Sequence, residues 1–502
     1  MVFRTRVSLG QTPGQGNGWR PGFLIVRTGS GFQSLRLMSS SQLKDSVRQT
    51  AGPDTPWWRL LNGYHWFVFL VASAAWFFDC LDQRLFSLAR IPALASLMHE
   101  SPSAPAVQAF GKVVTAWFLI GWGVGGMIFG ALGDRYGRAR MLTLTILIYS
   151  GFTGLSFLSR TAWDFTLFRF LTGLGVGGVF GLAVALIAET VPSGARVQAL
   201  GMLQVLSTVG NVAAGFAKMG IDNLEASKVV TPGEGWRWMF LIGSVPALMV
   251  LVTRGRLREP ESWLRLKESG GLPKGGIFAS YGSLLGDPRW RRNLVVGAVI
   301  ASTGVVGLWA IGEYAPDLQK TVFATHYQKA GLEGDAVKAA VNRAITNAYL
   351  LNMLGAATGM WLFTRLANAT GRRLAFAVGF VAALGVTFGV YWKMDSPQDA
   401  YWMMPLMGAA QLGVFAGFAI YLPELFPSRL RSTGTSFCYN LGRFAAAGGS
   451  FFSSILTKEV FVSHALPLPY RYSAMTMCVI FLFGLAALIF APETKGQPLP
   501  EE

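Results

Sequence analysis

The sequence predicts an all-α membrane protein with twelve transmembrane helices, arranged as two six-helix bundles related by a pseudo-two-fold repeat. Three observations lead to this fold class. The chain of 502 residues is 52% hydrophobic and only 14% charged, which leaves too little polar surface to cover a soluble globule of that length. It contains about twelve apolar runs of about 17 to 25 residues, long enough to cross a bilayer as helices. Two loop patterns also occur twice, which indicates a duplicated unit.

The duplication is visible in two pairs of loops. The stretch Gly130–Arg138 (GALGDRYGR) has a shortened copy at Asn368–Arg373 (NATGRR), in which the shared glycine recurs 234 residues later (371 − 137). The stretch Glu189–Arg196 (ETVPSGAR) recurs as Glu424–Arg431 (ELFPSRLR), 235 residues later (424 − 189). Two unrelated patterns at nearly the same offset are hard to obtain by chance. The two halves are therefore expected to share one architecture, with a binding site between them.

Residues 1–60 are predicted to form a basic, disordered N-terminal extension. They are rich in Arg, Ser and Gly and contain no acidic residue before Asp45, a composition that does not support a packed core. They also lack the apolar segment of a secretory signal. An organellar transit segment has a similar composition and remains an alternative, as does a start at Met38.

The rest of the chain divides into two bundles and two polar segments. We expect the N-terminal bundle at 61–254, a cytoplasmic linker at 255–292, the C-terminal bundle at 293–491 and a cytoplasmic tail at 492–502. The linker is assigned because charged residues and a Gly-Gly pair interrupt the hydrophobic pattern there. The expected spans, in order, are 64–90, 109–133, 141–159, 164–188, 198–220, 236–254, 293–318, 343–366, 374–392, 400–423, 433–456 and 472–491. The 60 glycines, several of them four residues apart, suit close helix packing in lipid.

The basic residues indicate the orientation. Most fall in loops that follow even-numbered spans, as Arg135, Arg138 and Arg140 do. By the positive-inside rule these loops are cytoplasmic. We therefore expect a multi-pass protein of the bacterial inner membrane with both termini in the cytoplasm. The formal net charge of +17 follows from this distribution, and no nucleic-acid partner is expected.

The sequence contains little that would support an enzyme. It has no Gly-Lys-Thr phosphate loop and no His-Glu-x-x-His motif, and its four histidines are scattered. The cysteines, Cys80, Cys438 and Cys478, all lie in expected spans without metal-ligand spacing. We expect no catalytic residue, no metal site and no cofactor.

These motifs resemble those of the major facilitator superfamily from about residue 60 onward. Gly130–Arg138 matches the loop between its second and third spans, and Arg169–Gly178 looks like its fourth-span motif. Three further stretches, Gly235–Trp238, Arg258–Trp263 and Pro492–Gly496, are similar to the sugar and metabolite porter branch. The resemblance implies a monomeric secondary transporter that works by alternating access.

Three details resemble the organic-acid:proton symporters of that branch, which include sialate, lactate and aromatic-acid carriers. These are Asp79–Asp82 in the first span, Gly307–Pro316 in the seventh and Tyr439–Arg443 in the eleventh. Cys80 and Leu81 depart from the Gly and aromatic residue of the family pattern. The resemblance implies a proton site in the first span and an anion site in the eleventh.

The acids of the first span need an explanation because a carboxylate in hydrocarbon is costly. Asp82 is expected at a depth similar to that of Arg169 in the fourth span, so the two can form an ion pair. Together with Asp79, this pair is a candidate proton switch. The alternatives are a permanent structural salt bridge, an acid that reaches the outer surface, and competition from Arg84.

Arg443 is expected near the membrane midplane with no acid in its own span. A planar guanidinium there is suited to bidentate capture of a carboxylate. The alternative is a partner acid from another span, either Glu313, which we otherwise place at the outer rim, or an aspartate of the first span. Further candidates for substrate binding are amide and aromatic side chains in other spans, namely Gln204, Asn211, Trp309, Asn347, Gln411 and Tyr439.

Charged residues in the repeated loops are candidates for a cytoplasmic gate. Asp134 can cap a helix and pair with basic residues when that gate is closed; the alternative is that the loop only sets the topology. The candidate gate residues are Asp134, Arg135, Arg138, Glu189, Arg196, Glu424 and Arg431. The loss of the acid at Asn368 predicts that the two halves gate differently.

The function that fits these observations is symport of a small organic acid or carboxylated metabolite with a proton. The expected partners are this solute, the proton and the lipid bilayer. A proton-coupled sugar or polyol symporter is the alternative, supported by the Pro492–Gly496 ending. A transporter-like nutrient sensor is a third interpretation, which the short C-terminal tail disfavours.

Overall fold

The computed structural model describes residues 24–28, 31–35, 56–253, 255–273, 275–312 and 314–501. Met1–Leu60 and Leu61–Glu502 are separate compact units. In the first unit, strand β1 (Leu24–Thr28) pairs antiparallel with β2 (Gly31–Leu35), and a 3₁₀ turn, η1, spans Trp57–Arg59. Most of the expected disordered extension, including Met38, lies outside the described residues.

All of the regular secondary structure described in the second unit is helical. Its first half contains α2 (Gly63–Met98), α3 (Pro105–Tyr136), α4 (Arg138–Leu155) with the turn η2 (Ser156–Leu158), α5 (Ala162–Thr190), α6 (Ser193–Ala226), and α7 (Gly235–Gly243) continued by η3 (Val245–Leu248) and α8 (Met249–Thr253). Two short helices follow, α9 (Glu261–Glu268) and α10 (Phe278–Gly286).

The second half repeats this order. It contains α11 (Pro288–Val306) continued by the π-turn η4 (Gly307–Ile311) and α12 (Tyr314–Lys329), then α13 (Gly334–Thr370), α14 (Arg372–Lys393), α15 (Pro397–Glu424), the turn η5 (Ser428–Leu430), α16 (Arg431–Ile455) with the π-turn η6 (Leu456–Val460), and α17 (Leu468–Met477) with α18 (Ile480–Phe490). Each of the twelve expected spans falls on one of these helical segments, and the predicted fold class is confirmed. The main difference is length, because several helices extend beyond the apolar run.

Nine helical segments in the described part of the chain are long and apolar enough to cross a membrane by themselves. The sixth segment, Gly235–Leu251, is apolar but shorter. Helix α16 is less apolar for a visible reason, since its buried face is polar and contains Ser432, Thr433, Ser436 and Asn440. Such a helix is stable in a bilayer when its polar face is turned toward other helices.

Glycine allows the closest helix contacts, and it does so equivalently in both halves. In the first half α3 packs along α5, and in the second α13 packs along α15. A Cβ atom on Gly125 would lie 2.0 Å from the carbonyl oxygen of Leu174, and one on Gly355 would lie 1.9 Å from that of Pro405. Both distances are too short for any side chain. The predicted role of the glycines in close packing is therefore confirmed at these positions.

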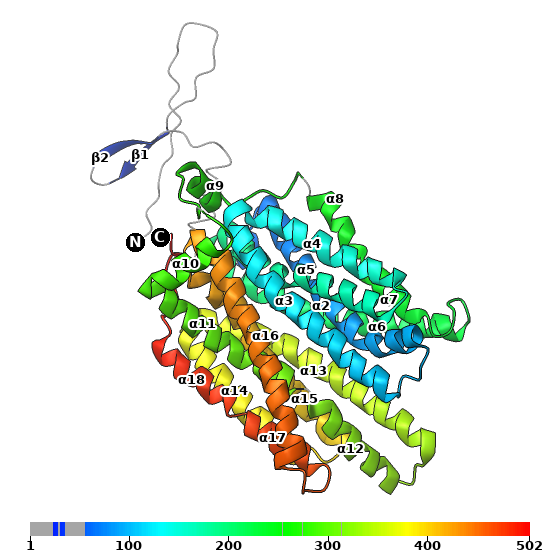
Figure 1. Ribbon diagram of the computed structural model, residues 1–502. Coiled ribbons are helices and arrows are strands. Elements are labelled where there is room, and N and C mark those ends of the chain that lie inside the picture. The colour runs from blue at the N-terminus through cyan, green and yellow to red at the C-terminus, as the bar shows by residue number, and fades with distance from the viewer. Residues whose placement is uncertain are drawn as a thin grey trace. The chain divides into compact units, whose positions relative to one another are not determined.

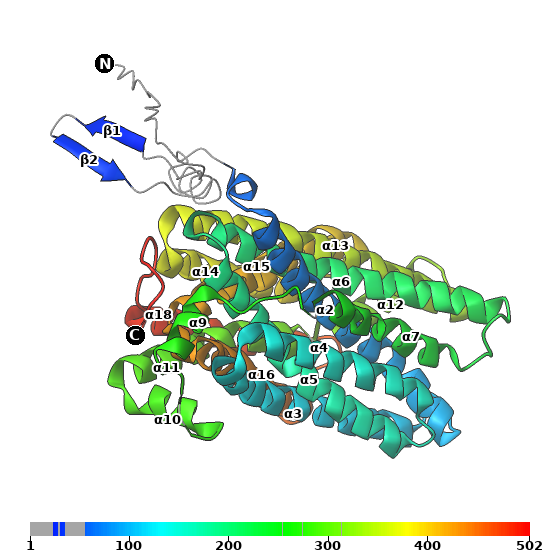
Figure 2. The ribbon, with the colours of Figure 1, turned by 90° about the horizontal axis from the view of Figure 1, so that it is seen from above.

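The two halves meet along a few helices. Helix α16 of the second half lies against α3 and α5, while α6 of the first half lies against α13 and α15 (Figure 2). We call the end where α3 stops and α4 begins the motif end, and the opposite end the far end. Helices α9 and α10 and the C terminus lie at the motif end (Figure 1).

Candidate functional site

The predicted ion pair between the first and fourth spans is present. Asp79 and Asp82 lie one turn apart on α2, and both side chains are fully buried. Oδ1 of Asp82 lies 3.6 Å from Nη1 of Arg169 and accepts a hydrogen bond from Thr153 Oγ1 at 2.9 Å. Arg84 does not compete for this acid, because its guanidinium lies 4.2 Å over the ring of Tyr349.

Arg169 is held mainly by neutral groups. Its guanidinium donates to Ser156 Oγ at 2.8 Å and to Thr172 Oγ1 at 3.0 Å, and it lies 4.5 Å from the ring centroid of Phe240. Among the residues described, its Nη1 has no hydrogen-bond partner, and neither does Oδ2 of Asp82. The contact is thus a monodentate ion pair, and both partners keep unused hydrogen-bonding capacity.

Asp79 is within electrostatic range of a cation of the second half of the molecule. Its Oδ2 accepts a hydrogen bond from Gln83 Nε2 at 3.2 Å, while Oδ1 has no partner in the described structure. The cation that acts on it electrostatically is Arg443 of α16. Arg443 stacks over Trp122 of α3, 3.2 Å from the ring centroid, and lies 5.0 Å from the ring of Tyr439. The Arg443 side chain is buried, with 6% of its surface exposed. No carboxylate among the described residues lies within 4.0 Å of its guanidinium, the distance limit for an ion pair.

A layer of aromatic and amide side chains crosses the interface between the halves, next to Asp79 and Arg443. Trp76 Nε1 donates to Gln204 Oε1 at 2.8 Å, and Gln204 Nε2 donates to the carbonyl oxygen of Phe415 at 3.1 Å. Tyr439 stacks on Phe180 with ring centroids 3.8 Å apart and meets the edge of Trp76 at 6.2 Å. Because Trp76 precedes Asp79 on α2 and Tyr439 precedes Arg443 on α16, the layer lies on the motif-end side of both charges.

Two other predicted amides, Asn211 and Gln411, are not part of this layer. Asn211 donates to the carbonyl oxygen of Ser207 in its own helix at 3.0 Å. Gln411 is buried and donates to Thr387 Oγ1 at 3.0 Å, a contact within the second half. Gln411 thus bonds between two helices, as such residues often do in lipid, whereas Asn211 bonds within its own helix.

Two further candidates also lie apart from the charges. Asn347 is exposed on α13, and Trp309 is half-buried in the π-turn η4. Glu313, expected at the outer rim or as a partner of Arg443, lies outside the described residues.

At the motif end, Asp134 joins the halves as a helix cap. Its Oδ1 accepts from the backbone N–H of Ser432 at 3.0 Å, and its Oδ2 accepts from the N–H of Thr433 at 2.8 Å and from Thr433 Oγ1 at 2.6 Å. These donors belong to the first turn of α16, where the helix dipole favours a negative charge. Nη2 of Arg138 lies 3.2 Å from the same carboxylate.

A second interaction between the halves involves Glu189 at the end of α5. Its carboxylate pairs with Arg138 at 3.1 Å and with Arg431 of the second half at 2.5 Å. Arg138 also donates to the carbonyl oxygen of Ser428. We call Asp134, Arg138, Glu189 and Arg431 the motif-end clamp; all four side chains are almost fully buried.

The equivalent acid of the second half has a different partner. Glu424 pairs with Arg372 of its own half at 2.7 Å and accepts a hydrogen bond from Thr494 Oγ1 at 2.6 Å. Asn368, in the place of Asp134, is exposed. The halves are therefore built differently at this end.

The last two gate candidates lie beside the clamp. Arg196 is within electrostatic range of Glu189 and Glu424, but no described carboxylate lies within 4.0 Å of it. Arg135 donates to the carbonyl oxygen of Gly275 in the linker and stacks over Tyr136 at 5.2 Å.

Two glutamates for which no role was predicted cap the helices that follow the repeated loops, α4 and α14. Glu259 of the linker accepts from the N–H groups of Ala139 and Arg140 at 3.1 and 3.0 Å. Glu493 of the tail, 234 residues later (493 − 259), accepts from those of Arg372 and Arg373 at 2.9 and 3.1 Å. The shared offset was the signal that could have identified them.

The two caps differ electrostatically. Burial raises the pKa of Glu259 above its ordinary value, despite the hydrogen bonds from the start of α4. Burial also opposes ionisation of Glu493, but there the backbone N–H donors prevail and lower its pKa. The linker cap therefore ionises less readily than the tail cap.

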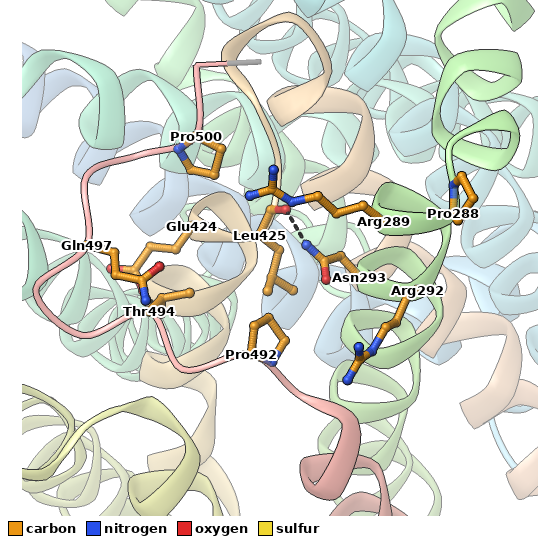
Figure 3. Close-up of a pocket in the computed structure, with 10 residues that line it drawn as sticks. All are labelled: Pro288, Arg289, Arg292, Asn293, Glu424, Leu425, Pro492, Thr494, Gln497 and Pro500. Carbon is orange, nitrogen blue, oxygen red and sulfur yellow. Dashed lines mark hydrogen bonds between the residues drawn. The ribbon is translucent and has the colours of Figure 1, made fainter.

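A pocket of about 500 Å³ lies at the motif end (Figure 3), and neither Asp79 nor Asp82 lines it. The start of α11, the end of α15 and the C-terminal tail form its walls. Asn293 anchors one wall by donating to the carbonyl oxygen of Leu425 at 2.9 Å. Of the predicted site residues, it contains only Glu424.

Some residues of the buried cluster were not predicted. Trp76 lies three residues before Asp79, on the same face of α2, and this spacing could have identified it. Trp122, Thr153 and Ser156 come from other helices, and their apolar or small-residue surroundings contain no local signal.

Helical spans in two halves over the described part of the chain, with buried charges near the place where the halves meet, are the architecture of a multi-pass membrane transport protein. A sequence model of the Major Facilitator Superfamily matches residues 66–450. The chain belongs to this superfamily, and the resemblance of its loop motifs is confirmed.

Known relatives support this assignment. A putative metabolite transport protein of Haemophilus influenzae is 27% identical over 444 residues, covering 88% of this chain and 99% of the relative. The niacin transporter NiaP of Acinetobacter baylyi is 25% identical over 471 residues, covering 88% and 96%. Among solved structures, the proton:xylose symporter XylE has a TM-score of 0.66 at 20% identity, covering 87% of this chain and 98% of that one. The protein is thus a transporter and not an enzyme.

Proposed function

We propose that this protein is a proton-coupled symporter of small organic acids that works by alternating access. We place it in a bacterial inner membrane as a monomer, with the motif end and both termini in the cytoplasm. The bundles are assigned to 61–254 and 293–491, joined by the linker 255–292. The observation that carries the proposal is Arg443, a buried guanidinium between the halves that faces Asp79 without an ion pair.

Arg443 favours an anionic substrate. A buried cation without a bonded counter-charge is costly, and a carboxylate that bonds its planar fork relieves this cost. Trp122 and Tyr439 flank the guanidinium, and these rings offer flat surfaces to a planar or apolar substrate body. The name of the niacin transporter among the relatives is consistent with such a carboxylate.

Asp79 and Asp82 are the proposed proton sites. An anion bound at Arg443 removes the positive charge that favours ionised Asp79, so substrate and proton binding become linked. Arg169 has the corresponding role at Asp82, which it contacts at 3.6 Å. Binding of one proton with one anion leaves the net charge of the site unchanged.

The motif-end clamp corresponds, in this proposal, to a closed cytoplasmic gate. Asp134 and Glu189 both bond the second half there, and the layer around Gln204 and Tyr439 closes the path beneath the charges. Substrate would then reach Arg443 from the far end. Opening the other way requires these bonds to break together.

A proton-coupled sugar symporter is the second candidate, supported by the fold shared with the xylose symporter. Uptake into proteoliposomes distinguishes the two. Labelled nicotinate, benzoate, lactate, sialate and xylose are presented with and without an inward proton gradient. We expect gradient-driven uptake of at least one acid and none of xylose; the opposite pattern supports the sugar.

The role of Arg443 is tested in the same assay. Arg443→Ala should abolish acid uptake, because Arg443 is the cation that acts on Asp79, whereas the other buried cation, Arg169, is already paired with Asp82. The matched control is Arg365→Ala, which removes an exposed guanidinium that stacks on Trp361 at 5.2 Å. Undiminished acid uptake by the Arg443 variant contradicts the anion site.

A further inference from the structure

Tyr149 is a buried tyrosine that the proposed coupling mechanism does not yet use. It lies in the middle of α4 with no solvent exposure, and its hydroxyl has no hydrogen-bond partner among the described residues. A buried hydroxyl without a hydrogen-bond partner is energetically unfavourable. Such a group in a well-packed bundle requires an explanation.

The surroundings of Tyr149 are acidic on one side. Asp79, Cys80 and Asp82 of α2 are the groups that act on its hydroxyl electrostatically. From α5, Arg169 donates to the carbonyl oxygen of Phe152, one turn along α4. Arg443 of α16 acts on Asp79 from the other half. The hydroxyl therefore lies within electrostatic range of both first-span carboxylates, and it forms no hydrogen bond to either of them in this conformation.

The spacing of residues on the two helices matches this placement. Both α2 and α4 run from the motif end to the far end. Thr153 of α4 bonds Asp82 of α2. Tyr149 lies one turn before Thr153 on α4, a rise of about 6.0 Å at 1.5 Å per residue. Asp79 likewise lies one turn before Asp82 on α2, a rise of about 4.5 Å.

Close packing fixes the position of this turn of α4. A Cβ atom on Gly175 of α5 would lie 2.5 Å from the backbone nitrogen of Tyr149. The absence of a side chain at Gly175 thus lets α4 approach α5 closely, and it places both the backbone and the Cβ atom of Tyr149 against α5. The start of the tyrosine side chain is therefore held in place by this helix contact.

Three buried oxygens in this region lack hydrogen-bond partners among the described residues: Tyr149 Oη, Oδ1 of Asp79 and Oδ2 of Asp82. We propose that the Tyr149 hydroxyl bridges the two carboxylates and passes a proton between them. This inference rests on the proposed proton sites and adds the residue that connects them.

The transfer is balanced. The O–H bond of protonated Asp79 breaks as a new O–H bond forms at Tyr149 Oη. The original O–H bond of Tyr149 breaks as one forms at Asp82 Oδ2. The tyrosine is neutral before and after, Asp79 ends ionised, and the proton has moved one turn along α2. No other reactant is needed.

The bridge can be tested without knowing the substrate. A protonated buried carboxyl group has a C=O stretching band, separate from that of carboxylates, which infrared difference spectroscopy of the purified protein follows through a pH titration. Bands that disappear in Asp79→Asn or Asp82→Asn are assigned to these acids. Tyr149→Phe removes only the hydroxyl, so the fold should be retained.

In Tyr149→Phe we expect the assigned bands to change frequency and their titration midpoint to move by about one pH unit or more. The matched control is Tyr391→Phe, which removes a buried hydroxyl that bonds Ile311 in the second half. It should leave both bands unchanged. Bands of unaltered frequency and midpoint in Tyr149→Phe overturn the bridge while the proton sites stand. If no titrating band depends on either aspartate, the proton sites and the bridge both fail.

Discussion

Asp134 of the first half binds Thr433 of the second half through two hydrogen bonds, from the backbone N–H at 2.8 Å and from Oγ1 at 2.6 Å. One carboxylate thus caps a helix that belongs to the other bundle. Removal of its charge weakens the cap but keeps the side-chain shape. This contact is consequently a sensitive point for the balance between the open and closed forms of the motif end.

Asp134→Asn is expected to favour opening of the motif end, by about 1–3 kcal/mol for the loss of charge-assisted hydrogen bonds. Spin labels at the exposed positions Arg140 and Arg373 report the separation of the halves, measured by double electron–electron resonance spectroscopy. The variant should show a larger population at long distance. Asp222→Asn, at an exposed acid whose ion pair in the described structure is with Lys218, is the control. An unchanged distance distribution contradicts the role of the cap.

The equivalent acids Glu189 and Glu424 are expected to differ in effect. Glu189→Gln weakens a contact between the halves, so it should lengthen the same spin-label distance. Glu424→Gln weakens a pair within the second half and should lower thermal stability, by about 3 kcal/mol for a broken buried pair, with the distance unchanged. Identical behaviour of the two variants would show that the asymmetry has no functional consequence.

The two loop caps should respond to pH with opposite sign. The pKa of Glu493 is below its ordinary 4.5, so its stabilising effect is present above pH 4.5 and is lost as the pH falls through the lowered value. The pKa of Glu259 is above 4.5, so its contribution is greatest below that pH and declines as the pH rises. Melting temperatures of wild type, Glu493→Gln and Glu259→Gln between pH 3 and 7 test this, because each difference from wild type isolates one cap.

Gly125→Ala should destabilise the first bundle, because its Cβ would lie 2.0 Å from the carbonyl oxygen of Leu174 and the backbone would have to shift. We expect a loss of about 1–3 kcal/mol, measured as thermal unfolding in detergent. Gly151→Ala is the control, since its Cβ meets nothing within 4 Å. Equal stability of the two variants would mean that the helices are less closely packed than the structure indicates.

The sequence predicts the parts of this protein that depend on local pattern. Apolar runs of membrane length locate most of the described spans, and the two offsets reveal the duplication. The depth estimate for Asp82 and Arg169 was enough to predict their contact, because both lie on regular helices of known rise.

What the sequence could not predict depends on how helices turn about their axes. An error of one residue rotates a side chain by about 100°. Gln411 and Asn211 therefore appeared equivalent to Gln204, although only Gln204 bonds across the interface. Trp122 was equally hidden, since its stacking on Arg443 requires two distant helices to meet.

Asp82→Asn is expected to separate substrate movement from the proton gradient. The amide keeps the hydrogen bond from Thr153 but cannot ionise, so it behaves as a permanently protonated acid and frees Arg169 from its only described ion pair. With the acid identified by the uptake screen, the variant should still exchange labelled for unlabelled substrate across the membrane, yet accumulate none against its gradient. Asp399→Asn, at a helix cap remote from the cluster, should do both. Proton-driven accumulation by Asp82→Asn would leave Asp79 as the sole coupling acid, because it is the other fully buried carboxylate of the first span.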